Sequence, residues 1–241
     1  MIILMKALNE ERVVDRVIGD FHDEKWVERV IVIDGGSTDY TVQELKKFKK
    51  VEVFVHPWCD GYHDMETMQS NVALSYVPHG EIAMILDFDE KMSPELKNFL
   101  AKIGNIMPVG SDIANVSRGT FEVMRHEDSP HAIIGEDGWP IISHQIGQYP
   151  DYQPRLIKKD PRLHWVNSPH HVMFGWPGMV QGNIDADIIH YEKDDYRDRL
   201  RIERKWARAQ SRRKMLGLPH DVFGCTVRPE VHKYTDPEEW K

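Results

Sequence analysis

Two aspartates that follow an apolar run are the residues of this sequence best suited to chemistry. Asp87 and Asp89 come directly after residues 82–86, which are typical of a buried strand. On an extended backbone, residues two apart point to the same side, so we expect both carboxylates to face one ligand. Paired carboxylate oxygens suit Mg²⁺ or Mn²⁺ that carries a substrate diphosphate. Two surface acids that bind nothing would give the same pattern.

Another acid occupies a comparable place earlier in the chain. Asp34 follows the apolar residues 30–33 and begins the segment Asp-Gly-Gly-Ser-Thr-Asp. Glycines let a backbone approach a ligand closely, and the Ser/Thr/Asp cluster can cap a following helix. Ligands of open α/β sheets bind beyond the carboxyl ends of the strands, where we expect both Asp34 and Asp87. As a tight turn with an N-cap, the segment needs no ligand.

The elements that must position these acids alternate between strand and helix. Because strand–helix units repeat, the sequence predicts an α/β fold with a mostly parallel sheet and helices on both faces. Buried strands are expected at residues 2–5, 30–33, 51–55 and 82–86, with further strands at 113–123 and 140–146 in a second half that is richer in Gly and Pro.

The predicted helices have recognisable first residues. Asn9 is expected to cap a helix whose apolar side includes Val13 and Phe21. Ser93 as N-cap and Pro94 at the first helical position predict a helix that runs through Leu100. Shorter helical patterns cover residues 42–48 and 65–76.

Composition limits the class of protein. The 241 residues are 41% hydrophobic and 29% charged, as expected for one large globular domain. Cys59 and Cys225 have no CxxC spacing, and neither a dinucleotide-binding GxGxxG nor a Walker-type phosphate loop is present. No apolar run approaches the ~20 residues of a membrane span, so we expect a cytoplasmic protein.

Charge is distributed unevenly along the chain. Residues 197–214 contain nine Lys/Arg and two acids, whereas the whole chain has a net charge of −8. Arg201, Arg204 and Arg208 recur at helical spacing and predict a basic helix face. That face is either simply solvated or meets an anionic acceptor, a membrane surface or a nucleic acid.

Several blocks together carry a family resemblance. They are Leu-Asn-Glu-Glu at 8–11, Val-Ile-Asp-Gly-Gly-Ser-Thr-Asp-Tyr-Thr at 32–41, Asn71 with Ala-Leu at 73–74, and Ile-Leu-Asp-Phe-Asp-Glu from residue 85. In order and spacing they resemble family 2 glycosyltransferases with the GT-A fold. The small lipopolysaccharide-core-type β-glucosyltransferases are the most similar group, because Tyr-Pro-Asp-Tyr-Gln-Pro-Arg-Leu at 149–156 and Ile-Ile-His-Tyr-Glu at 188–192 match their later blocks.

The resemblance implies a nucleotide-sugar-binding half at 1–104 and an acceptor-side half of the same domain at 105–195, and the charge pattern predicts a basic helix and arm at 196–241. It implies transfer of a hexose from a nucleotide sugar, with UDP favoured, to an acceptor hydroxyl. The implied nucleotide-site residues are Ala7, Leu8, Glu10, Asp34, Asn71, Asp87 and Arg155, and we expect Asp34 to accept a hydrogen bond from the base. The implied ligands of Mn²⁺ or Mg²⁺ are Asp87, Asp89 and His190.

The general base is where the sequence departs from the family. Relatives have His-Glu where this chain has His170-His171. His171 could take the proton from the acceptor, because an imidazole pKa near ~6.5 is adequate; Asp151 and Glu122 are the alternatives. Two other functions remain open: a catalytically silent nucleotide-sugar-binding protein, or a zinc hydrolase using His164, His170, His171 and His190, although no recognised zinc spacing is present.

Overall fold

The computed structural model describes residues 1–57, 65–107, 111–127, 131–166, 172–175 and 181–191. These all belong to a compact unit that spans Met1–Asp195. The predicted basic face at 197–214 and the His170-His171 pair therefore lie outside the described residues.

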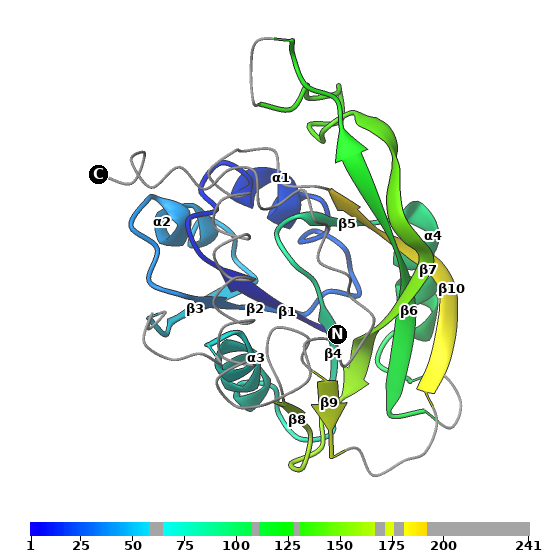
Figure 1. The fold of residues 1–241 in the computed structure, drawn as a ribbon. Coiled ribbons are helices and arrows are strands. Elements are labelled where there is room, and N and C mark those ends of the chain that lie inside the picture. Colours follow the sequence, from blue (N-terminus) through cyan, green and yellow to red (C-terminus); the bar gives the residue numbers. More distant parts are fainter. Residues whose placement is uncertain (58–64, 108–110, 128–130, 167–171, 176–180, 192–241) are drawn as a thin grey trace, which may run out of the picture. The chain divides into compact units, whose positions relative to one another are not determined.

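A mixed, mostly parallel sheet forms the framework of the described fold (Figure 1). Its strand order is β3-β2-β1-β4-β7-β6-β10-β5, and only β7 and β5 run antiparallel to their neighbours. The strands are β1 (Ile2–Ala7), β2 (Arg29–Asp34), β3 (Val51–Val55), β4 (Ile82–Ile85), β5 (Glu90–Met92), β6 (Ile113–Val123), β7 (Ile142–Lys158) and β10 (Gln181–Tyr191), while β8 (His164–Val166) pairs with β9 (Val172–Phe174) in a separate small sheet.

Helices cover both faces of this sheet, which confirms the predicted α/β architecture. Helices α1 (Val14–Gly19), α2 (Thr41–Leu45) and α4 (Pro94–Ile103) share one apolar core with Ile3 and Met5 of β1. Helix α3 (Met65–Ser75) and the small sheet share the other core with Ile2 and Leu4. Alternate residues of β1 thus enter opposite cores, as the two-residue period of a strand requires.

The start of α4 follows the sequence prediction closely. Ser93 Oγ accepts a hydrogen bond from the Leu96 backbone N–H at 3.1 Å, and Pro94 occupies the first helical position. The cap satisfies a donor that has no partner within the helix, and proline loses nothing there because its missing N–H would be unpaired. This helix packs Leu96 and Leu100 into the core that also contains Leu86 and Phe88, which follow β4.

The predicted cap at Asn9 is wrong. Helix α1 starts only at Val14, and Asn9 has a φ of 57°, in the left-handed region that asparagine tolerates better than most residues. Its side-chain oxygen accepts a hydrogen bond from the Thr38 backbone N–H at 2.8 Å instead. A contact with a distant loop therefore replaces the local cap.

The predicted extension of the strand through Asp89 is also wrong. Strand β4 ends at Ile85, and the chain then turns, with the Glu90 backbone N–H donating to the Asp87 carbonyl at 3.1 Å. The argument that residues two apart point to the same side does not apply to a turn. Phe88 is buried, while Asp87 and Asp89 contact different partners.

Between β6 and β7 the chain extends beyond the sheet, and we define the hairpin arm as the described residues 124–127 and 131–141 (Figure 1). Trp139 fixes the described part of this arm to the body of the sheet. Its side chain is buried, stacks on Tyr191 with ring centroids 5.2 Å apart, and has the cations of Arg16 and Lys91 each 5.2 Å from its ring. In the part of the chain that the structure describes, no helix is long and apolar enough to cross a membrane.

Candidate functional site

The loops that follow β1 and β2 are bonded into one unit. The Asn9 backbone N–H donates to Ser37 Oγ at 2.9 Å, and the Glu10 backbone N–H donates to Thr41 Oγ1 at 2.7 Å. Two blocks that the sequence assigns to the nucleotide site are therefore held together by their own polar atoms. Ala7 ends β1 beside Asp34 of β2, and its carbonyl accepts from the Gly35 N–H at 2.8 Å.

Asp34 is buried at the end of β2 and supports the turn that follows it. Its Oδ1 accepts hydrogen bonds from the backbone N–H groups of Gly36 and Ser37 at 3.1 and 3.0 Å, and its Oδ2 accepts one from the Ser37 hydroxyl. Both carboxylate oxygens thus contribute to the tight turn. The predicted contact between Asp34 and a nucleobase stays a prediction.

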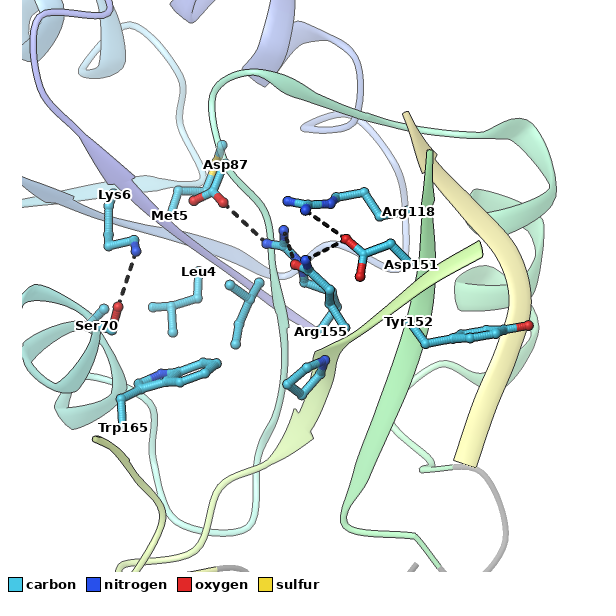
Figure 2. A pocket seen from close by; sticks show the side chains of 14 residues that line it. Leu4, Met5, Lys6, Ser70, Asp87, Arg118, Asp151, Tyr152, Arg155 and Trp165 are labelled. Carbon is cyan, nitrogen blue, oxygen red and sulfur yellow. Dashed lines mark hydrogen bonds and ion pairs between the residues drawn. The ribbon is translucent and has the colours of Figure 1, made fainter. Parts of the chain in front are cut away.

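A pocket of about 450 Å³ lies beside the carboxyl ends of β1 and β4 (Figure 2). Its charged lining residues are Lys6, Asp87, Arg118, Asp151 and Arg155. Figure 2 shows these side chains converging from β1, the turn after β4, β6 and β7, with Trp165 of β8 on another wall. The edge of the sheet predicted to bind a ligand therefore does contain a polar cavity.

Asp87 lies on the wall of this pocket next to positive charge. Arg155 NH1 donates to Asp87 Oδ2 at 3.4 Å. Burial would raise the pKa of Asp87, but the charges of Lys6 and Arg155 outweigh it and hold that pKa below its ordinary value. Asp87 is therefore an anion at neutral pH, as a ligand of a metal or a ribose hydroxyl should be.

Asp89 faces His190 of β10 on the other side of the turn. The distance from His190 Nε2 to Asp89 Oδ2 is 3.4 Å, and His190 Nδ1 lies 3.2 Å from Thr120 Oγ1. Burial would lower the pKa of His190, but Asp89 raises it above the ordinary value. A metal ion would replace that proton, since a histidine ligand must be neutral.

This donor set fits a divalent cation that also binds substrate. A carboxylate and an imidazole whose second nitrogen contacts a hydroxyl form a common metal-binding arrangement. Among the described residues, no group of three or more His, Cys, Asp or Glu could hold a metal ion by itself. The remaining ligands would come from substrate phosphates and water, which is usual for Mg²⁺ and Mn²⁺.

Asp151 is the candidate general base that the structure brings into the pocket. Arg118 NH2 and Gln153 Nε2 both donate to its Oδ2, each at 2.8 Å, and its side chain is 35% exposed. Glu122 instead pairs with His144 Nε2 at 3.2 Å on the extension toward the hairpin arm, and it does not line the pocket.

Asn71 connects two elements around the pocket. Its Nδ2 donates to the Trp165 carbonyl at 2.9 Å, and its Oδ1 accepts from the Trp165 N–H at 2.7 Å. The Asn71 side chain thereby connects α3 to β8, because it pairs with both the N–H and the carbonyl of Trp165, as the backbone of a neighbouring strand would. Its predicted contact with the nucleotide remains a prediction, while its contacts explain how Trp165 reaches the pocket wall.

Four polar residues of the site were not predicted from the sequence. Lys6 Nζ donates to Ser70 Oγ at 3.1 Å on one side of the pocket. Arg118 holds Asp151, and Glu90 lies buried beside Arg155. A single lysine or serine on an element carries no local signal. The one hint was that Glu90 extends an already acidic turn.

The zinc hypothesis gains no support from the described residues. His164 on β8 bonds through Nδ1 to the Arg162 carbonyl at 2.6 Å, whereas His190 on β10 faces Asp89. The other two histidines of that set lie outside the described residues.

Two solved structures are similar to part of this chain. TarS from S. aureus, solved with UDP-GlcNAc, is 22% identical over 56% of this chain and 38% of that chain, with a TM-score of 0.40. Glucosyl-3-phosphoglycerate synthase from Mycobacterium tuberculosis, solved with Mn²⁺ and UDP-glucose, is 19% identical over 48% of this chain and 43% of that chain, with a TM-score of 0.38. The matches thus span less than half of either protein.

The family comparison covers more of the sequence. The model of the glycosyl transferase family 2 matches residues 2–175, which include β1 to β9 and therefore the turn with Asp87 and Asp89 and both arginines of the pocket. The chain belongs to glycosyl transferase family 2.

Proposed function

We propose that this protein transfers a hexose from a nucleotide sugar to an acceptor hydroxyl, in a reaction that requires a divalent metal ion and inverts the anomeric centre. The observation that carries the proposal is the pairing of Asp89 with His190 at the turn after β4, 3.4 Å apart, in a chain of family 2. UDP is the favoured nucleotide because of the sequence blocks described above.

The metal ion would be held by Asp89 and His190 together with the donor diphosphate, while Asp87 faces the ribose side. When bound, Mn²⁺ or Mg²⁺ would neutralise the charge that develops on the departing diphosphate. The Thr120 hydroxyl, 3.2 Å from His190 Nδ1, keeps the imidazole turned with Nε2 toward Asp89.

Lys6 supplies further positive charge on the donor side. It lies on β1 beside Asp87, and a hydrogen bond to Ser70 of α3 fixes its ammonium group. An ammonium group beside a phosphate needs no special geometry to attract it. We therefore assign Lys6 to charge compensation in the bound donor.

Asp151 is the proposed base among the described residues. As the acceptor oxygen attacks the anomeric carbon, Asp151 Oδ1 would take the hydroxyl proton, while the bond from that carbon to the diphosphate oxygen breaks and its electron pair leaves with the diphosphate. Both described hydrogen bonds to Asp151 use Oδ2, which supports Oδ1 as the proton acceptor. His170 and His171 remain alternative bases from the sequence alone.

Incubation with a panel of nucleotide sugars, with and without Mn²⁺, tests the proposal. Metal-dependent release of nucleoside diphosphate, fastest with a UDP-hexose, is expected even without the true acceptor, because water can slowly replace it. Binding of UDP-sugar without any turnover in the presence of acceptor sugars would favour the catalytically silent alternative.

A further inference from the structure

Glu90 is a fully buried acid that the proposed reaction does not use. Its side chain is 0% exposed. Its Oε1 contacts Arg155 NH2 and lies 3.8 Å from Arg118 NH1, and its Oε2 accepts a hydrogen bond from the Asp87 backbone N–H at 3.0 Å. A carboxylate is costly to bury without such partners, so these contacts are required for the fold to tolerate Glu90 at this place.

Glu90 closes the turn that carries the two aspartates with both its backbone and its side chain. Its backbone N–H donates to the Asp87 carbonyl at 3.1 Å, while its side chain accepts from the Asp87 N–H. Between these bonds, Phe88 is buried in the apolar core. Glu90 therefore contributes to the position of both aspartates, while the Tyr191 N–H of β10, which donates to the Asp89 carbonyl at 2.8 Å, also holds Asp89 near His190.

The same carboxylate connects this turn to the acceptor-side strands. Arg155 comes from β7 and also donates to Asp87 Oδ2 at 3.4 Å and to Gln153 Oε1 at 3.1 Å. Arg118 comes from β6 and donates to Asp151 Oδ2 at 2.8 Å. A continuous chain of charged contacts thus runs from Asp87 through Glu90 and the two arginines to Asp151 (Figure 2 shows its two ends).

We propose that Glu90 is a positioning residue, which fixes the turn with Asp87 and Asp89 relative to Asp151 through Arg155 and Arg118. It touches neither donor nor acceptor, and it acts through the groups that do. The inference rests on the proposed function, because it concerns how Asp87 and Asp89 are held relative to the proposed base, Asp151. Mutating a residue that orients a metal ligand without touching the metal typically lowers metal affinity or activity about 10- to 100-fold.

Glu90→Gln is the decisive variant. Glutamine keeps the size of the side chain and an oxygen that can accept from the Asp87 N–H, but it removes the carboxylate between the buried Arg155 and the partly exposed Arg118. We expect the kcat for UDP release to fall about 10- to 100-fold and the affinity of the UDP-loaded protein for Mn²⁺, measured by calorimetry, to fall by a similar factor. Glu90→Asp keeps the charge and should recover part of both losses.

Glu52→Gln is the matched control. Glu52 also pairs with an arginine, since Arg29 Nε donates to its Oε1 at 2.7 Å, but the pair joins β2 to β3 and lies outside the pocket lining. We expect this control to leave kcat and Mn²⁺ affinity unchanged. If Glu90→Gln lowers the melting temperature but keeps wild-type kcat and Mn²⁺ affinity, Glu90 is only structural and the proposal is wrong.

Hydrogen exchange separates this inference from the proposed function. Peptides that cover residues 84–92 and 151–158 should exchange faster in Glu90→Gln than in wild type, and Glu52→Gln should leave them unchanged, whether or not any nucleotide sugar is turned over. If wild type shows no turnover but the exchange result is as expected, the proposed function fails and the coupling through Glu90 stands. Unchanged exchange at both peptides would overturn the coupling itself.

Discussion

His190 Nε2 lies 3.4 Å from Asp89 Oδ2, although Asp89 lies in the turn after β4 and His190 lies far along the chain on β10. The pairing arises because β5, which begins one residue after Asp89, runs antiparallel to β10, with Glu90 opposite His190 in the register. A short strand of three residues thereby brings a carboxylate and an imidazole together.

Removing the imidazole should weaken metal use without abolishing it. We expect His190→Ala to raise the Mn²⁺ concentration that gives half-maximal UDP release by about tenfold or more, because one ligand is lost. Thr120→Val, which only removes the hydroxyl 3.2 Å from His190 Nδ1, should shift the same titration in the same direction by less. An unchanged Mn²⁺ titration in His190→Ala would show that His190 is structural.

Asp34 should affect both stability and nucleotide binding. Asp34→Ala leaves the N–H groups of Gly36 and Ser37 without their acceptor, so we expect the free energy of unfolding to fall by about 1–3 kcal/mol. If Asp34 also contacts the base, calorimetry will show weaker UDP binding in the same variant.

Asp34→Asn serves as the control for the turn, because its amide oxygen can still accept those backbone hydrogen bonds. Wild-type UDP affinity in Asp34→Ala, at a temperature where that variant is folded, would leave Asp34 with its structural role alone.

Trp139 should determine the order of the hairpin arm. Its indole is 4% exposed between Tyr191, Arg16 and Lys91, so truncation to alanine removes a large buried contact. We expect Trp139→Ala to cost about 3–5 kcal/mol in unfolding free energy, or less if the arm opens on its own, with faster hydrogen exchange at residues 131–141.

Tyr40→Ala is a suitable comparison for the arm, since Tyr40 is an aromatic residue with 67% of its surface exposed. Equal exchange and equal stability in the two variants would mean that Trp139 does not hold the arm.

Much of the framework could be predicted because buried strands and helices show a pattern of apolar residues along the local sequence. Continuous apolar runs predicted β1, β2 and β4, the mostly apolar residues 51–55 predicted β3, and Ser93-Pro94 predicted the first turn of α4. The family and its GT-A architecture also followed from the sequence blocks. In each case the determining interaction lies within a few residues along the chain, or the pattern is set by a whole buried face.

The rest of the site could not be predicted because its partners are distant in sequence. Asn9 looked like a helix cap, but the loop of Thr38, which is distant in sequence, supplied a competing donor. Asp87 and Asp89 looked like a pair on a strand, but Glu90 and Arg155 stabilise a turn there. No periodicity signals that Arg118 and Arg155 meet one buried carboxylate, because that contact exists only once β6 and β7 have paired.

The most direct test of the account compares Mn²⁺-dependent UDP release by wild type and by Asp89→Asn, with Asp23→Asn as the control. Asp23 is also an aspartate, but its side chain is 90% exposed and lies outside the pocket. We predict that Asp89→Asn folds normally and loses more than about 100-fold of its Mn²⁺-dependent UDP release, while Asp23→Asn keeps wild-type activity. Full activity in Asp89→Asn, or in wild type with excess chelator, would contradict the proposed metal-dependent transfer.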